Sequence, residues 1–298
     1  MAIYRRVEYD YSYKKYAKTI SQNAYNNLQL YRKLNNKYKI RESNIIANLF
    51  WDREITCFTY TEKYLYYLQY DFSTVFVLLI CIYAISRVFV FEKESGMDLL
   101  LITTNKGRQT IKAKIIATFL FVIMVTSIFG ILDYIMFSVF FGSFGSNSSP
   151  LYSLANYQNT RLNVNLLQYS VISFSVKLLG ILVICTFFVL FSCIFSKALY
   201  SYLASFISVI VLIRLYDIKT NMIFSSFAKY INPVSLIMNR ELYKETIFIN
   251  IFCYPIYQDL VAIVVGICWI ILSVILINLF ARKNNLGKRT RRSKNATS

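Results

Sequence analysis

The sequence of 298 residues contains no histidine, only 15 acidic residues and only eight glycines. The absence of histidine excludes Ser-His-Asp triads, HExxH zinc sites and other histidine-based acid–base schemes. A P-loop is also excluded, because Gly287-Lys288 is preceded by Arg282 where GxxxxGK[ST] requires its first glycine. The six cysteines never form CxxC and mostly lie in apolar runs, as small buried hydrophobic residues do. We therefore expect no enzyme, no nucleotide site, no metal and no cofactor.

Charge is scarce and apolar residues are abundant. Only 16% of the residues are charged, whereas 56% are hydrophobic and 17% aromatic. Soluble domains are typically about 45–50% apolar and about 25% charged. These values exclude a soluble enzyme and a disordered protein, and they favour an all-α polytopic membrane protein. Five apolar stretches are long enough to cross a bilayer. The expected spans are residues 73–91, 115–141, 170–195, 198–216 and 260–281.

The distribution of Lys and Arg predicts the orientation. Thirteen of them lie in residues 92–114, in the hairpin at Lys197 and in the tail 282–298, against five in the loops on the other side. Because basic residues accumulate on the cytoplasmic side, the C-terminus is expected inside the cell membrane and residues 1–72 outside. A basic block that directly follows an apolar span is more typical of a cytoplasmic anchor than of a nucleic-acid site. No nucleic-acid partner is therefore expected.

Residues 1–72 carry 12 basic and 7 acidic side chains and have no apolar signal-peptide core at their start. Export of such a polar segment normally requires a preceding span, so the chain is expected to lack a first membrane helix. The alternative is that residues 1–72 stay in the cytoplasm and that one span is assigned wrongly.

Two helices are expected within this N-terminal segment. Apolar and aromatic residues recur at helical spacing at Tyr13, Tyr16, Ile20, Ala24, Leu28 and Tyr31. A second helix is expected to begin at Ser43, a good capping residue. The tyrosine-rich stripe either binds an amphiphilic ligand or packs against neighbouring helices or the lipid surface, and packing is the more common role.

Four ionisable residues interrupt the apolar spans: Arg87, Asp133, Lys177 and Arg214. Each is expected near an end of its span, where a long side chain can reach the interface. No charge is expected at the midplane, which argues against a proton pump or an ion-coupled carrier. Asp133 is a candidate to pair with Lys177 or Arg214, and these three form a possible intramembrane polar cluster.

The segment after the first span, Glu92–Arg108, begins with acidic residues and ends with Gly107-Arg108. Acids at the start and bases at the end of a helix suit its dipole, and Gly107 is placed to end it. The pattern predicts a short cytoplasmic helix that presents Met97 and Leu100 to a partner. The alternative is an interfacial helix that packs on lipid.

The pattern Glu92-Lys93-Glu94-x-Gly96, followed by Leu99-Leu100, Thr103, Gly107-Arg108 and Lys112 or Lys114, resembles the first cytoplasmic loop of ABC-2 type transporter permeases. The similarity is greatest to the Gram-positive type with an extracellular insert. Further similar segments are 65–71, 149–151, 231–233 and 250–255, so the resemblance covers about residues 60–281. The expected lack of a first membrane helix is a departure from the family.

The resemblance implies that this loop is a coupling helix that docks on a separate ATP-binding subunit. The implied docking residues are Glu92, Glu94, Gly96, Met97, Leu99, Leu100, Thr103, Gly107 and Arg108. It also implies a homo- or heterodimer of permease halves that moves or extracts an amphiphilic peptide, lipid or drug-like substrate, with antimicrobial peptide resistance as one such role. The alternative is a membrane sensor, immunity protein or remnant subunit that transports nothing.

Overall fold

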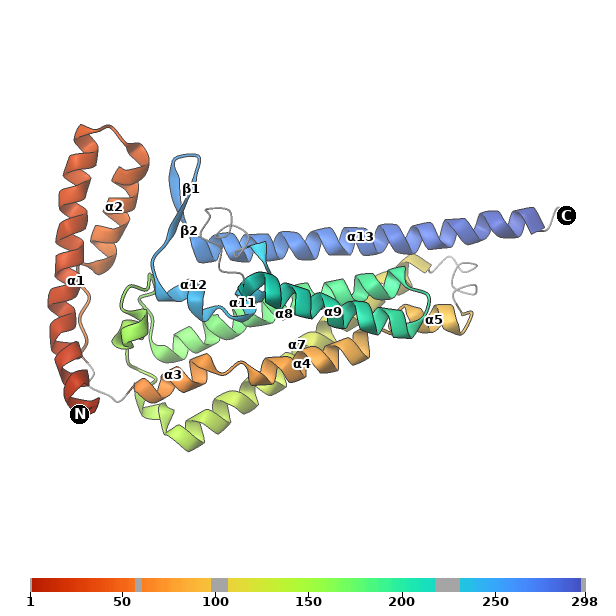
Figure 1. Ribbon diagram of the computed structural model, residues 1–298, viewed down its shortest axis with the longest axis horizontal. Helices are drawn as coiled ribbons and strands as arrows, with labels where there is room; N and C mark the ends of the chain where they lie inside the picture. Colours follow the sequence, from red (N-terminus) through yellow and green to blue (C-terminus); the bar gives the residue numbers. More distant parts are fainter. Residues whose placement is uncertain (1, 57–60, 98–106, 218–230, 296–298) are drawn as a thin grey trace. The chain divides into compact units, whose positions relative to one another are not determined.

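The computed structural model describes residues 2–56, 61–97, 107–217 and 231–295, and these residues are mostly helical (Figure 1). They form two compact units. Unit 1 comprises Met1–Tyr70, Asp133–Ser175 and Asn239–Ala262, and unit 2 comprises Asp71–Leu132, Val176–Met238 and Ile263–Ser298. Each unit therefore combines segments that are far apart in the sequence.

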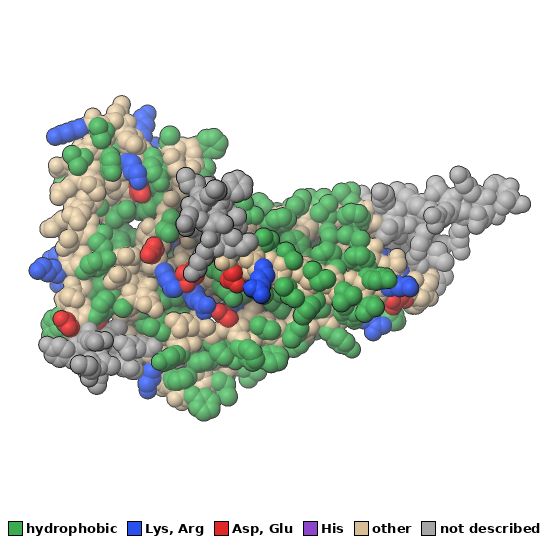
Figure 2. Space-filling view, viewed as in Figure 1, with side chains coloured by type: hydrophobic (Ala, Val, Ile, Leu, Met, Phe, Trp, Pro, Cys, Tyr) green, Lys and Arg blue, Asp and Glu red, His purple; other side chains and the backbone are tan. Residues whose placement is uncertain are grey.

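Five helical stretches among the described residues are long and apolar enough to cross a membrane, as predicted for a multi-pass membrane protein. They are Lys63–Glu94, Gln109–Phe141, Leu166–Ile194, Ala198–Asp217 and Gln258–Ala281. Their outward side chains are apolar: Leu120, Phe140 and Leu199, for example, are all exposed. Figure 2 shows hydrophobic side chains over most of the visible surface of unit 2. Helices that are apolar on all sides suit lipid.

The first of these stretches is not one continuous helix. It consists of α3 (Glu62–Gln69), α4 (Phe72–Ile85) and α5 (Val90–Glu94), which are separated at Tyr70-Asp71 and by the turn at residues 86–89. The other long helices are α7 (Gly107–Phe141), α8 (Leu166–Ile194), α9 (Ala198–Asp217) and α13 (Gln258–Asn295). Only three residues separate α8 from α9, which confirms the expected tight hairpin. The backbone of the basic tail continues α13 to Asn295.

Unit 1 contains a helical hairpin of α1 (Ala2–Lys33) and α2 (Lys37–Phe50). The predicted stripe on α1 is largely confirmed as a packing surface, because Tyr13, Ala24 and Leu28 are buried. Ile20 and Tyr31 are half-buried, whereas Tyr16 is exposed and its hydroxyl donates to Asn159 Oδ1 at 2.9 Å.

The predicted start of the second helix was wrong. Helix α2 begins at Lys37, because Asn36 has an extended backbone and its side chain accepts from the Lys39 amide. Asparagine caps a helix as well as serine does. Asn35, with φ +51°, ends the preceding helix in the left-handed region. Ser43 is instead buried inside α2.

Unit 1 also contains short elements that the sequence analysis did not predict. These are the 3₁₀ turns η1 (Ser143–Ser146), η2 (Leu151–Ser153) and η3 (Ala155–Tyr157), the short helix α12 (Arg240–Lys244), and the strands β1 (Phe248–Ile251) and β2 (Tyr254–Tyr257). The strands pair as an antiparallel hairpin, with Phe248 opposite Tyr257 and Ile251 opposite Tyr254.

A tyrosine–arginine cluster joins α1 and α2 to the loop around η2. The Tyr13 ring stacks on Tyr152 at 5.1 Å, and its hydroxyl donates to the Gln158 carbonyl. Arg53 is only 3% exposed; its guanidinium lies 4.4 Å from the Phe50 ring centre, and its Nε donates to Asn163. Burial raises the pKa of Tyr13 to about 12, although the nearby Arg53 acts in the opposite direction.

The raised pKa predicts alkaline destabilisation of unit 1. The unfolded chain releases the Tyr13 proton near pH 10 and the folded chain near pH 12, so the folded state binds more protons in this window and stability falls as pH rises through it. Between pH 10 and 12 the wild type should lose about 2–3 kcal/mol more than Tyr13→Phe. The measurement is denaturant unfolding followed by the emission of Trp51. Equal pH slopes in both proteins would contradict the prediction.

Unit 2 packs around a core drawn from α4, α7, α8 and α13, including Cys81, Val122, Phe188 and Ile277. The short helix α11 (Val234–Ile237) lies directly against α8 at Gly180. A Cβ added to Gly180 would lie 2.9 Å from the Leu236 Cβ and 3.0 Å from the Ile237 backbone nitrogen. Small residues allow such close approach of helices in membranes.

We therefore expect Gly180→Ala to lower the stability of unit 2 by about 1–3 kcal/mol, because a backbone atom cannot move aside easily. Gly266→Ala is the matched control. The closest atoms to its added Cβ would be the flexible ends of Leu179 and Leu236, at 2.6 and 2.7 Å. Thermal unfolding in detergent, followed by Trp269 emission, should show the larger drop for Gly180→Ala. A larger drop for Gly266→Ala would refute this account of the packing.

Candidate functional site

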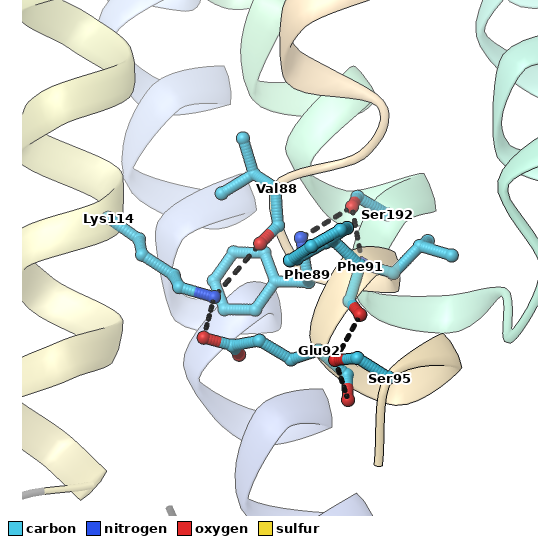
Figure 3. Close-up of polar contacts among 8 residues, drawn as sticks. Val88, Phe89, Phe91, Glu92, Ser95, Lys114 and Ser192 are labelled. Atoms are coloured by element: carbon cyan, nitrogen blue, oxygen red, sulfur yellow. Dashed lines mark hydrogen bonds and ion pairs between the residues drawn. The ribbon is translucent and has the colours of Figure 1, made fainter. Parts of the chain in front are cut away.

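The candidate site is helix α5 in unit 2, with its contacts to the ends of α7, α8 and α9 (Figure 3). The helix follows the turn at residues 86–89. Its first amide groups are satisfied by a side chain of α8: Ser192 Oγ accepts from the amides of Phe89 at 2.9 Å and Val90 at 3.3 Å. These amides have no partner within their own helix, so Ser192 acts as a cap supplied from another helix.

An ion pair attaches α5 to α7. Lys114 Nζ contacts Glu92 Oε1, donates to the Val88 carbonyl at 2.9 Å and lies 4.7 Å from the centre of the Phe89 ring. Both charged side chains are about four-fifths buried. Figure 3 shows that Lys114 reaches from α7 both to the Val88 carbonyl, in the turn before α5, and to Glu92 within α5. A partly buried pair with an added hydrogen bond is better shielded from water than a surface pair.

The next two residues of α5 attach it to the α8–α9 hairpin. Lys93 Nζ donates to the carbonyls of Ser192, Cys193 and Phe195, at 3.3, 2.5 and 2.9 Å, where α8 ends. Glu94 Oε1 accepts from the Ala198 amide at 2.8 Å, where α9 begins. A cation at a helix C-terminus and an anion at a helix N-terminus both match the helix dipole. Adjacent side chains of opposite charge thus bind the two ends that the hairpin joins.

The segment after α5 turns away through Gly96. Ser95 Oγ donates to the Phe91 carbonyl at 2.7 Å, and Gly96 follows with φ +70°. This left-handed conformation favours glycine, although the space around Gly96 is open. Two apolar side chains here are exposed: Phe91, within α5, is 52% exposed, and Met97, after it, is 50% exposed.

The predicted docking residues therefore divide into groups. Glu92 and Glu94 contact their own chain, Gly96 forms the turn and Met97 is exposed. Leu99, Leu100 and Thr103 lie outside the described residues. Gly107 and Arg108 are the first residues of α7. Gly107, which was predicted to end the docking helix, therefore begins the helix that follows.

Three residues outside the predicted docking set complete the site: Lys93 and Lys114, which belong to the loop pattern, and Ser192, which no pattern indicated. Lys93 belongs to the Glu-Lys-Glu motif, and the alternation of its charges was a signal that the three side chains have different partners. The partner of Lys93 is a set of backbone carbonyls, which no residue pattern reveals.

The three residues of the possible intramembrane cluster, Asp133, Lys177 and Arg214, are divided between the two units. Lys177 Nζ lies 4.0 Å from Asp71 Oδ1, and Arg214 lies in the last turn of α9, where its charge suits the dipole. Asp133 belongs to unit 1, whereas Lys177 and Arg214 belong to unit 2. Its pairing with either of them stays a prediction.

Within the residues that the structure describes, no three His, Cys, Asp or Glu side chains are grouped to hold a metal ion. Comparison with protein-family models, with curated proteins and with solved structures found no match to the chain. The functional assignment therefore depends on the sequence pattern and on the geometry of α5.

Proposed function

We propose that the chain is the permease subunit of an ABC transporter, driven by ATP that a separate ATP-binding subunit hydrolyses. The observation that carries the proposal is that α5, at the start of the predicted docking loop, is bound to α7, α8 and α9 through Glu92, Lys93 and Glu94. A force applied to this segment acts on the ends of three apolar helices together. Rigid helices that tilt about such contacts are a known way to switch between access states.

The division of roles within the segment follows from exposure. Glu92, Lys93 and Glu94 make contacts within the chain, so the exposed Phe91 and Met97 are the described side chains left for the partner subunit. Two residues of the predicted docking set therefore have a different proposed role: Glu92 and Glu94 transmit movement to the other helices. The exposed apolar residues make the contact with the partner subunit. An exposed apolar residue near a polar rim is typical of an interface anchor.

The proposed substrate class is an amphiphile such as a peptide, a lipid or a drug-like molecule, with antimicrobial peptide resistance as one physiological role. An open groove of about 460 Å³ on unit 1 supports this class. It combines the exposed rings of Tyr25 and Trp51 with the amides of Gln22, Asn26 and Asn48. Ligand sites typically join apolar and aromatic surface with a few polar groups.

The proposed orientation places the C-terminus in the cytoplasm and residues 1–72 outside the cell membrane, because Lys and Arg accumulate on the tail side. The proposed assembly is a homo- or heterodimer of permease halves bound to ATP-binding subunits. A sensor, immunity or remnant subunit that transports nothing is the competing hypothesis, and the same experiment separates the two.

The test is affinity purification of the full chain from its native membranes, followed by identification of a P-loop ATPase and assay of ATP hydrolysis. We expect the wild type to retain this subunit and Phe91→Ser/Met97→Ser to lose most of it. Trp51→Ser, a similarly exposed residue of unit 1, should retain it. Failure of the wild type to retain any P-loop ATPase, or ATP hydrolysis by the chain alone, would refute the proposal.

A further inference from the structure

The tip of the β1–β2 hairpin in unit 1 has an unfavourable backbone. Ile251 pairs with Tyr254, so Phe252 and Cys253 form a two-residue turn, and their φ angles are +48° and +64°. Such turns strongly prefer Asn-Gly, because side chains at positive φ are strained. Strained residues persist only where the surrounding structure holds them, and they cluster at functional sites.

The turn presents an aromatic side chain to solvent. Phe252 is 94% exposed, more than any other large hydrophobic residue among those described. Two contacts hold the turn in place: Asn250 Oδ1 accepts from the Cys253 amide, and Arg41 donates from α2 to the Cys253 carbonyl, both at 3.0 Å. The Arg41 guanidinium also lies 3.8 Å from the centre of the exposed Tyr254 ring. Phe252 is thus held outward by its own chain.

The neighbouring end of the α1–α2 hairpin is basic. Figure 1 shows that this helical turn and the β1–β2 turn lie toward the same end of unit 1. Residues 32–42 contain five basic side chains and one acid, Glu42, which pairs with Lys39. Lys37 lies one helical turn from Arg41 on the same face. Leu34, between the helices, is exposed.

The hairpin is also close to the bilayer along the chain. Strand β2 ends at Tyr257, and the apolar span of α13 begins at the next residue, Gln258. A four-residue strand extends about 13 Å, so the tip lies within reach of the headgroup layer that borders this span. Exposed aromatic rings beside Lys and Arg are the composition of protein segments that bind this layer.

We infer that the tip at Phe252, together with Tyr254, Lys37 and Arg41, binds the anionic headgroup surface of the bilayer in which the chain is embedded. Phe252 and Tyr254 enter the apolar–polar boundary, and the two cations contact lipid phosphates. A single projecting ring has no pocket of its own, and a fluid lipid surface requires no complementary shape. The inference does not depend on the proposed transport function.

The test uses the full chain with Trp51→Phe and Trp269→Phe, so that F252W supplies the only tryptophan. The protein is reconstituted as single copies in nanodiscs of phosphatidylcholine, with or without phosphatidylglycerol. With the anionic lipid, we expect a blue-shifted emission, quenching by brominated lipid and protection from aqueous acrylamide. Lys37→Gln should reduce these effects without touching the turn. Lys14→Gln, an exposed lysine on α1 that pairs with Glu54, is the matched control and should not.

Two results would overturn the inference. One is emission and acrylamide quenching that are the same with and without the anionic lipid. The other is protection from acrylamide without quenching by brominated lipid, which indicates contact with protein instead of lipid. Arg41→Gln tests separately whether the contact of Arg41 with the Cys253 carbonyl holds the turn. It should increase the mobility of the F252W side chain, measured by its fluorescence anisotropy.

Discussion

Replacement of Arg161 by methionine is expected to lower the free energy of unfolding of unit 1 by about 3–5 kcal/mol. Arg161 donates from Nε to Asp259 Oδ2 at 3.0 Å and through Nη2 to the same oxygen, and its guanidinium lies 4.4 Å from the Tyr257 ring centre. Asp259, in the first turn of α13, is only 3% exposed. Without Arg161, this buried carboxylate loses its ion-pair partner.

The measurement is denaturant unfolding of the full chain with Trp269→Phe, so that Trp51 reports on unit 1. Replacing both partners, with Arg161→Met and Asp259→Leu, should restore most of the lost stability, because no buried charge then remains. The exposed pair of Lys14 and Glu54, which are 56% and 47% exposed, is the matched control. Lys14→Met should leave the unfolding midpoint unchanged. A double variant as unstable as Arg161→Met would contradict the account.

Replacement of Lys93 by methionine is expected to release the α8–α9 hairpin from α5. Three carbonyls at the end of α8 lose a charged donor, and hydrogen bonds to charged groups each contribute about 1.5–3 kcal/mol. We expect a loss of at least about 3 kcal/mol in local stability. Hydrogen exchange at the amides of residues 196–200 should become faster by at least about a hundredfold, which is the same free energy expressed as a rate.

Three further variants identify the cause of this effect. Lys93→Arg should restore part of the protection, because the positive charge remains. Glu94→Gln should cost less, because its Oε1 can still accept from Ala198. Lys112→Met, an exposed lysine of α7, should have no effect. If the chain is the proposed permease subunit, Lys93→Met should still retain the ATP-binding subunit through Phe91 and Met97 but lose ATP-driven transport. Unchanged exchange in Lys93→Met would show that α5 does not hold the hairpin.

Parts of the fold follow from local patterns. The apolar runs predicted five membrane-crossing stretches, because a helix in lipid satisfies its backbone within the segment and needs apolar side chains all around. The residues Tyr13, Ala24 and Leu28 predicted the buried face of α1, because residues that recur at helical spacing lie on one face of a helix. The start of α2 was missed because Asn36 and Ser43 are both good capping residues, and only the position of the turn at Asn35 selects the first.

The hairpin at 248–257 was missed because two four-residue strands give too short an alternation, and its turn carries Phe252-Cys253 in place of the usual Asn-Gly. The contacts of the candidate site were missed for a different reason. Ser192 and Ala198 lie about a hundred residues from α5, and their contributing atoms are a hydroxyl and a backbone amide that have no distinctive sequence pattern.

By itself, the sequence determined that this is a helical protein with five stretches apolar enough to cross a membrane, because hydrophobicity and helical period are properties of consecutive residues. It also indicated the segment around Glu92–Gly96 as the candidate functional site. Only the tertiary structure decided that Glu92, Lys93 and Glu94 bind three different helices of their own chain, and that Phe252 is held outward by Arg41. Such partners are brought together by packing between distant segments, which no local pattern encodes.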